Sequence, residues 1–438
     1  MQSESRPVAD VLAELDARRA QDPDEHGGRL FGLVYPTGHP ELEALTHDVY
    51  ERFLFSNALN PLRFPRLAEM EREVIAVAGD LAHRSPTERH GGSMTSGGTE
   101  SILMSMLVNR ERARQRGIER PQILAPVSAH PAYAKAAHYF DLDFVQIPLD
   151  EDYRADVSAA RSLISDRTCV VVGAAYSYPH GIMDPITELA ALASEYGAAC
   201  HVDACIGGFV LPFMEMLGFD VPPWDFRVEG VTEISMDVHK YGYVPKGASV
   251  ILHRDDDWVW HQTFFYERWG SGLYATPAIA GARAAAPAVA AWAVMQHLGI
   301  DGYKNIVAEL LSTTEHLRRG IEAIDGLEIV GDPIGPLLAL QSHRIDLYAV
   351  ADVMEEKGWY LNRNVEPYGL HLMLSPAHRS VVDELLADLA FAVAHHGESK
   401  GVAARYARTV SRTLSLRTFL HREGPEERCC ASAVRLGV

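Results

Sequence analysis

The sequence predicts an α/β fold, with a large domain built on a mainly parallel sheet and a smaller C-terminal α+β domain. From about residue 61 to residue 260, apolar β runs alternate with helical patterns, which is typical of a parallel sheet covered by helices. One βαβ unit inside this stretch is unusually clear. The chain has 438 residues, of which 47% are hydrophobic, so it can bury a large core and divide into two domains.

An N-terminal arm precedes the large domain. Residues 1–60 read as a helix, an irregular aromatic segment from Gly32 to Gly38, and a second helix. We expect this arm to contribute to the active site. The large domain is then expected over residues 61–300.

The clear βαβ unit begins with the buried-strand run Thr168–Ala175. Asp184 is expected to cap the following helix, with Pro185 at its first position. The helix is expected to end at Gly197, and the next strand leads to Asp203. Because ligands in open α/β sheets bind outside the carboxyl ends of strands, Asp203 is a candidate site residue.

The smaller domain is expected over residues 301–400. Candidate strands begin at Leu327, Leu337 and Leu370, and a helix is expected from about Leu347 to Lys357. Residues 401–438 differ in composition and are interpreted as a disordered or peripheral tail.

The composition excludes several classes of partner. A net charge of −19 argues against nucleic acid and against an anionic membrane surface. No apolar run reaches the roughly 18–20 residues that span a bilayer, and the first residues do not resemble a secretory signal. The five cysteines lack metal-ligand spacing, so we expect reduced thiols, no metal site, no stable membrane anchor and a cytoplasmic location.

Two segments could hold the phosphate and the ring of a cofactor. Gly97, Gly98 and Thr99 stand directly before a long helical pattern, where backbone N–H groups and the helix dipole favour a phosphate. His130 lies at a strand-to-helix turn, where its flat ring could stack on an aromatic cofactor. A histidine in that place also suits a helix cap or the core.

Two further segments carry the chemistry of a carbonyl cofactor. Lys240 follows His239 just after a β-branched run, and lysine forms a Schiff base with an aldehyde once its amine is neutral. A nearby cation would lower the pKa of that amine. Asp203 could keep a pyridine nitrogen protonated, or could merely cap a turn. Phosphate cradle, stacking histidine, carboxylate and lysine together predict pyridoxal 5′-phosphate.

Four motifs resemble the sphingosine-1-phosphate lyases, in the group II decarboxylase branch of fold-type I pyridoxal-phosphate enzymes. They begin at Ser96, His201, Asp225 and His239, and the likeness spans roughly residues 30–400. The resemblance implies a sheet of the seven-stranded type and a homodimer with shared active sites. It also implies cleavage of the C2–C3 bond of a phosphorylated sphingoid base, giving a fatty aldehyde and phosphoethanolamine.

The resemblance also assigns roles to individual residues. Lys246 and Tyr35 would be catalytic, with Lys246 near the substrate phosphate or in proton transfer. Tyr178 would line the substrate site, although both tyrosines also suit packing at a loop rim. Residues of the implied substrate shell and of the loop that reaches the partner's cofactor are Asn57, Asn60, Arg363, Ser271 and Gly272.

The substrate shell departs from the family pattern, which leaves a second activity open. Asn60 stands where the family usually has a histidine, and Arg363 could replace the lost phosphate contact or recognise a carboxylate. An amino-acid decarboxylase of the same branch is therefore the alternative. A protein of another class, an inactive fold used as an interaction scaffold, is disfavoured by the full set of cofactor residues.

Overall fold

The computed structural model describes residues 5–86 and 91–398, and a seven-stranded sheet forms its centre. The strands lie in the order β1-β7-β6-β5-β4-β2-β3, and only β7 runs antiparallel to its neighbours. This arrangement confirms the predicted mainly parallel sheet. The strands are β1 (Gly91–Thr95), β2 (Gln122–Pro126), β3 (Asp143–Ile147), β4 (Thr168–Ala174), β5 (Ala199–Asp203), β6 (Glu233–Met236) and β7 (Ser249–His253).

Helices cover both faces of this sheet, because successive strand residues point to opposite sides. In β4, Val170 and Val172 join one apolar cluster and Val171 joins the other. The first cluster is covered by α4 (Gly98–Gln115), α5 (Ala132–Phe140) and α9 (Trp258–Gln262). The second contains residues of α3 (Pro65–Leu81), α6 (Val157–Leu163), α7 (Ile186–Glu195), η1 (Gly207–Phe209) and α8 (Leu211–Met216).

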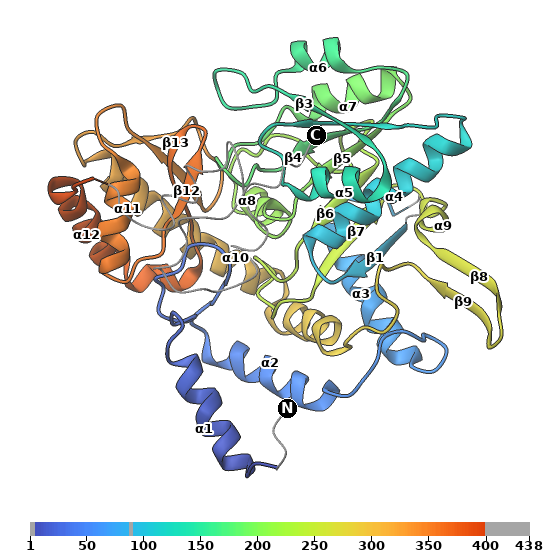
Figure 1. Ribbon diagram of the computed structural model, residues 1–438, viewed down its shortest axis with the longest axis horizontal. Helices are drawn as coiled ribbons and strands as arrows, with labels where there is room; N and C mark the ends of the chain where they lie inside the picture. The colour runs from blue at the N-terminus through green and yellow to red at the C-terminus, as the bar shows by residue number, and fades with distance from the viewer. Residues whose placement is uncertain (1–4, 87–90, 399–438) are drawn as a thin grey trace, which may run out of the picture.

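The smaller sheet is antiparallel and lies at the other end of the molecule (Figure 1). Its strands lie in the order β10-β11-β13-β12. The sequence did not predict β12; the candidate strands of this domain began only at Leu327, Leu337 and Leu370. The elements are β10 (Glu328–Ile329), β11 (Leu337–Gln341), α11 (Leu347–Glu356), β12 (Asn362–Val365), β13 (Tyr368–Met373), η2 (Pro376–Ser380) and α12 (Val382–His395).

One helix, α10 (Ala286–Glu322), connects the two sheets. It contacts α2 and α3 with its first part and η2, α12 and β10 further on. Gly299 interrupts its helical geometry with φ 55° and ψ −172°. This kink falls one residue before the predicted end of the large domain at residue 300.

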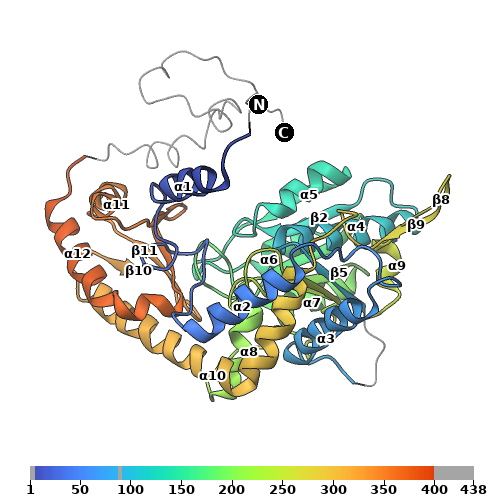
Figure 2. The same ribbon diagram turned by 90° about the horizontal axis from the view of Figure 1, so that it is seen from below.

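The N-terminal arm consists of α1 (Val8–Arg19), an irregular segment and α2 (Pro40–Phe53). The irregular segment runs along the small sheet, where the N–H of Gly32 donates to the carbonyl oxygen of Met373 at 3.0 Å. A two-stranded hairpin, β8 (Phe264–Trp269) and β9 (Gly272–Thr276), projects from the opposite end (Figures 1 and 2).

The predicted cap of α7 is wrong by one residue. Asp184 does not cap the helix, because its carboxylate accepts N–H bonds from Ala155 at 2.9 Å and Ala174 at 2.8 Å. Pro185 therefore occupies the N-cap position, without a side-chain cap, and the helix begins at Ile186. The helix ends at Glu195, and Gly197 adopts the expected positive φ of 65°.

Two sequence expectations concern other parts of the chain. The predicted tail at 401–438 lies outside the described residues. Among the residues that are described, no helix is both long and apolar enough to cross a membrane.

Candidate active site

A cavity of about 350 Å³ lies at the carboxyl ends of the parallel strands. The turn after β1 contributes the predicted Gly97, Gly98 and Thr99, and the turn after β2 contributes His130. The remaining predicted residues that line it are Asp203 at the end of β5, Tyr178 after β4, and His239 and Lys240 after β6. The structure thus brings together residues more than 140 positions apart in the sequence.

Backbone N–H groups at the start of α4 face this cavity without a side-chain cap. Gly97 is the N-cap residue, and α4 begins at Gly98. A Cβ atom on Gly98 would lie 2.8 Å from both the Asp237 carboxylate and the Cys205 sulfur, so only glycine fits there. The uncapped amides of an 18-residue helix provide a suitable cradle for a phosphate.

Lys240 projects into the cavity and is paired with a buried carboxylate. Its Nζ lies 2.9 Å from Oδ2 of Asp237, whose other oxygen, Oδ1, has no hydrogen-bond partner. Burial alone would lower the pKa of Lys240, but the neighbouring Asp237 carboxylate outweighs it and raises the pKa above its ordinary value. We expected a nearby cation to lower the pKa of Lys240. That expectation is wrong in this structure, because the pKa is raised.

His239 is neutral and fixed in one tautomer. Burial lowers its pKa to about 4. The N–H groups of Gly247 and Ala248 both donate to its Nδ1 at 3.3 Å, so its proton lies on Nε2, 3.6 Å from the Asp237 carboxylate. This geometry makes His239 a wall of the cavity close to Gly97, where a Cβ would lie 3.0 Å from its ring.

His130 and Asp203 both line the cavity, and each is held by local hydrogen bonds. The Nδ1 of His130 accepts the N–H of Ala132 at 3.2 Å, and burial lowers the pKa of this histidine. Asp203 accepts the N–H of Cys205 at 3.1 Å through Oδ1 and the hydroxyl of Tyr133 at 3.4 Å through Oδ2. A neutral imidazole and a carboxylate in one cavity suit an aromatic ring with a protonated nitrogen.

Lys246 and Tyr35, the two residues predicted to be catalytic besides Lys240, do not line this cavity but meet each other beside it. The Lys246 amine lies 4.4 Å from the centre of the Tyr35 ring and donates to the carbonyl oxygen of His239 at 3.2 Å. Although its side chain keeps contact with solvent, partial burial and the nearby Lys240 charge lower its pKa to about 8. Burial also raises the pKa of Tyr35, so this phenol stays neutral. The pKa shift anticipated for Lys240 thus falls on Lys246.

The remaining predicted residues belong to the substrate shell and to the loop expected to reach the partner's cofactor. None of them lines the cavity that the described residues of this chain form. Asn57 and Asn60 are exposed and accept backbone N–H groups in local turns. Arg363 pairs with Asp352 at 2.8 Å. Ser271 and Gly272 lie at the exposed tip of the β8–β9 hairpin. Their proposed roles remain predictions.

The sequence analysis overlooked two acidic residues of the site. Asp237 stands three positions before Lys240, the spacing of an ion pair on one helical turn, and this spacing was available as a signal. Glu100 accepts the N–H and hydroxyl of Ser96 at 2.7 and 2.6 Å, and its second oxygen accepts the N–H of Ile279 at 2.9 Å. Glu100 therefore joins the phosphate cradle to the segment that follows the hairpin.

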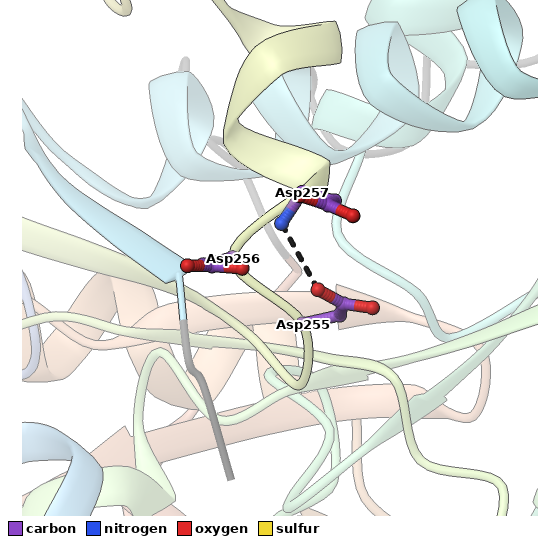
Figure 3. A group of neighbouring side chains, drawn as sticks. All are labelled: Asp255, Asp256 and Asp257. Carbon is purple, nitrogen blue, oxygen red and sulfur yellow. Dashed lines mark hydrogen bonds between the residues drawn. The ribbon is translucent and has the colours of Figure 1, made fainter.

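A separate acidic cluster precedes α9, outside this cavity. In Asp255, Asp256 and Asp257, one oxygen from each carboxylate lies within 4.8 Å of the others. The N–H of Asp257 donates to the Asp255 carboxylate at 3.0 Å, as expected in a helix-starting turn (Figure 3). None of the three lines the cavity.

The donor set fits pyridoxal 5′-phosphate, and it defines the class of protein: a pyridoxal-phosphate-dependent enzyme of fold type I. The family model for the pyridoxal-dependent decarboxylase conserved domain matches residues 34–342. The chain belongs to this family, and within it to the sphingosine-1-phosphate lyase family.

Individual relatives support this assignment. The chain is 40% identical over 391 residues to a sphingosine-1-phosphate lyase of Arabidopsis thaliana, covering 88% of this chain and 72% of the relative. A solved sphingosine-1-phosphate lyase of Burkholderia pseudomallei aligns with a TM-score of 0.87 at 35% identity, covering 94% of each chain. A probable L-tyrosine/L-aspartate decarboxylase of Methanothermobacter thermautotrophicus is 34% identical over 363 residues, covering 83% of this chain and 96% of the relative.

Proposed function

We propose that this enzyme cleaves the C2–C3 bond of a phosphorylated sphingoid base, giving a fatty aldehyde and phosphoethanolamine. The observation that carries the proposal is a second lysine beside the cavity that Lys240 lines: the Lys246 amine lies 4.4 Å from the centre of the Tyr35 ring and donates to the carbonyl oxygen of His239. Lys240 is held as a cation by Asp237, whereas Lys246 has a pKa of about 8 and is partly neutral at physiological pH. The identity with known lyases supports the substrate class.

The residues of the site divide the work of this reaction. Bound pyridoxal 5′-phosphate supplies an aldehyde carbon for the substrate amine and a ring that accepts the electron pair of the broken bond. The start of α4 would bind the phosphate, Lys240 would hold the aldehyde before substrate arrives, and Asp203 would keep the proton on the pyridine nitrogen. His130 would orient the ring.

Lys246 is the candidate for the proton transfer that distinguishes a lyase. In its neutral form, Lys246 would take the proton from the C3 hydroxyl, so that C3 becomes the aldehyde carbon when the C2–C3 bond breaks. C2 then takes up one proton, which completes phosphoethanolamine. Tyr35, whose ring lies under the Lys246 amine, would stabilise the ammonium that forms when Lys246 takes this proton.

This role makes the rate depend on pH in a defined direction. Because the pKa of Lys246 is lowered to about 8, the amine is mostly protonated below pH 8 and mostly neutral above it. We expect kcat/KM to fall about tenfold for each pH unit below 8 and to level off above it. Lys246→Ala should retain the visible absorbance of the bound cofactor, lose most turnover and lack this pH limb. An unchanged rate in Lys246→Ala would remove Lys246 from the reaction.

The product assay tests the proposed activity directly. The loaded enzyme is incubated with a phosphorylated sphingoid base, and separately with L-tyrosine, L-aspartate or L-glutamate, while aldehyde and CO₂ are measured. We expect aldehyde from the phosphorylated base and no CO₂ from the amino acids. Release of CO₂ without aldehyde would establish the decarboxylase alternative, which the similarity to a probable decarboxylase keeps in view.

The proposal includes a cytoplasmic homodimer with shared active sites. The β8–β9 hairpin exposes Phe264, Tyr266, Trp269 and Leu273, an apolar surface that suits an interface. A two-stranded ribbon is only marginally stable alone, so a partner subunit would also hold it in place. A cytoplasmic location accords with the free thiols of the three described cysteines.

A further inference from the structure

The segment after β4 carries three cavity-lining side chains and is bonded to the small domain. Tyr176, Ser177 and Tyr178 line the cavity, and residues 176–181 are called the tyrosine loop below. Its Gly181 carbonyl oxygen accepts the N–H of Ile334 at 2.9 Å. The His180 ring donates to the carbonyl oxygen of Glu366 at 2.9 Å. The tyrosine loop is therefore fixed by groups outside the domain that supplies the cofactor residues.

Asn364 and His371 form a third connection between the tyrosine loop and the small sheet. The amide nitrogen of Asn364 donates to the carbonyl oxygen of Pro179 at 2.7 Å. Its oxygen must then face Nδ1 of His371, 3.0 Å away, so that Nδ1 carries the proton. His371 is 2% exposed, and burial lowers its pKa to about 4, so the ring is neutral. Its Nε2 is consequently an acceptor, and it has no hydrogen-bond partner.

The His371 ring then contacts the tyrosine loop a second time. It meets the Tyr178 ring edge to face, with centroids 4.7 Å apart and an interplanar angle of 90°. Two residues further along β13, on the same face of the strand, the sulfur of Met373 accepts the Tyr35 hydroxyl at 3.0 Å. One strand of the small domain thus contacts both tyrosines of the proposed substrate site.

Two neighbouring side chains on β12, Arg363 and Asn364, point to opposite sides of the strand and have different partners. Arg363 points toward Asp352 and Glu355, whereas Asn364 points toward the tyrosine loop, as the alternation of a strand requires. On this strand, Asn364 and not the predicted Arg363 contacts the tyrosine loop.

We propose that His371, oriented by Asn364, is a positioning residue that sets the Tyr178 ring in the wall of the cavity. The expected effect of His371 on substrate binding rests on the proposed lyase activity. His371 does not line the cavity, so it acts through Tyr178, and its removal changes the binding of substrate more than the chemistry at the cofactor. The residues that bind the cofactor are untouched by this change.

A double-mutant cycle tests this coupling in the cofactor-loaded enzyme. His371→Leu should raise KM for the phosphorylated base about tenfold and leave kcat within about twofold, a size usual for coupling between contacting residues. In a Tyr178→Ala background, the same change should have no further effect on KM. His343→Leu, at an exposed histidine of the same domain, is the matched control and should change neither constant. Equal increases in KM in both backgrounds would overturn the proposal.

A second measurement does not depend on turnover. Amide hydrogen exchange in residues 176–182 should become at least about tenfold faster in His371→Leu and Asn364→Ala, because each removes a connection that holds the tyrosine loop. The exposed Asn305→Ala is the control. Unchanged exchange in both variants would also overturn the proposal.

The two measurements separate failure of this inference from failure of the proposed function. If wild-type enzyme does not cleave the phosphorylated base, the lyase proposal fails, and the exchange rates alone decide whether His371 positions the tyrosine loop. If His371→Leu does not yield folded, cofactor-loaded protein, His371→Asn and Asn364→Ala enter the same cycle with Tyr178→Ala.

Discussion

Lys240→Ala is expected to abolish both the visible absorbance of the bound cofactor and the turnover of substrate. Loss of a covalent nucleophile typically lowers kcat by about 10⁴-fold or more, and here the aldehyde also loses its attachment point. Absorbance after purification and gel filtration, together with aldehyde release, measures the two effects. A variant that keeps its colour would exclude Lys240 as the attachment residue.

The same substitution also leaves Asp237 buried without its cation. Removing one partner of a buried ion pair costs about 3–5 kcal/mol of folding free energy, so thermal unfolding must be measured in parallel. Lys240→Arg keeps a cation opposite Asp237 but cannot attach the aldehyde. We expect Lys240→Arg to be more stable than Lys240→Ala and equally inactive. Lys135→Ala, at an exposed lysine of α5, should retain colour and activity.

Asp203→Asn is expected to retain the cofactor and to lower kcat by a hundredfold or more. The carboxylate would stabilise a protonated pyridine nitrogen. Removing the charge partner of a buried group costs about 3 kcal/mol, and a barrier raised by that amount lowers the rate by more than a hundredfold. The shape of the side chain is conserved, and its single amide oxygen can still accept the N–H of Cys205, whereas the NH2 group takes the place of the oxygen that accepts from Tyr133.

The cofactor spectrum distinguishes this effect from misfolding. With Asp203→Asn, the visible band should shift in its dependence on pH because the ring nitrogen loses its proton more readily. Asp166→Asn, at an exposed position before β4, should change neither spectrum nor rate. Normal turnover in Asp203→Asn would show that the carboxylate does not act on the ring.

The sequence was sufficient to predict the parallel sheet and the residues that meet in the cavity, and both have the same physical reason. Strands buried on both faces give uninterrupted apolar runs, and the residues at their carboxyl ends must meet at one edge. Asp203 and Lys240 could therefore be placed near each other from their positions after two separate strands, β5 and β6. Asp184 was wrongly predicted to cap the helix. Its carboxylate instead accepts the N–H groups of Ala155 and Ala174, which lie in other segments.

The residues that sequence reasoning missed depend on contacts between distant segments. Strand β12 is short and polar, and it exists through pairing with β13 rather than through its own pattern. His371 and Asn364 carry no motif; only their approach to the tyrosine loop reveals a role. The directions of the pKa shifts likewise depend on the folded geometry: Asp237 raises the pKa of Lys240, whereas burial and the Lys240 charge lower the pKa of Lys246.

The two oxygens of Glu100 have a thermodynamic consequence. One oxygen binds Ser96 in the phosphate cradle, and the other binds the N–H of Ile279 beside the exposed hairpin. Binding that orders the Ser96 side of this link reduces the conformational entropy that remains to be lost on the Ile279 side. The same holds in the other direction, because such coupling is reciprocal. If a partner subunit buries the hairpin, the two bonds of Glu100 would be one route by which occupation of the cradle and burial of the hairpin favour each other.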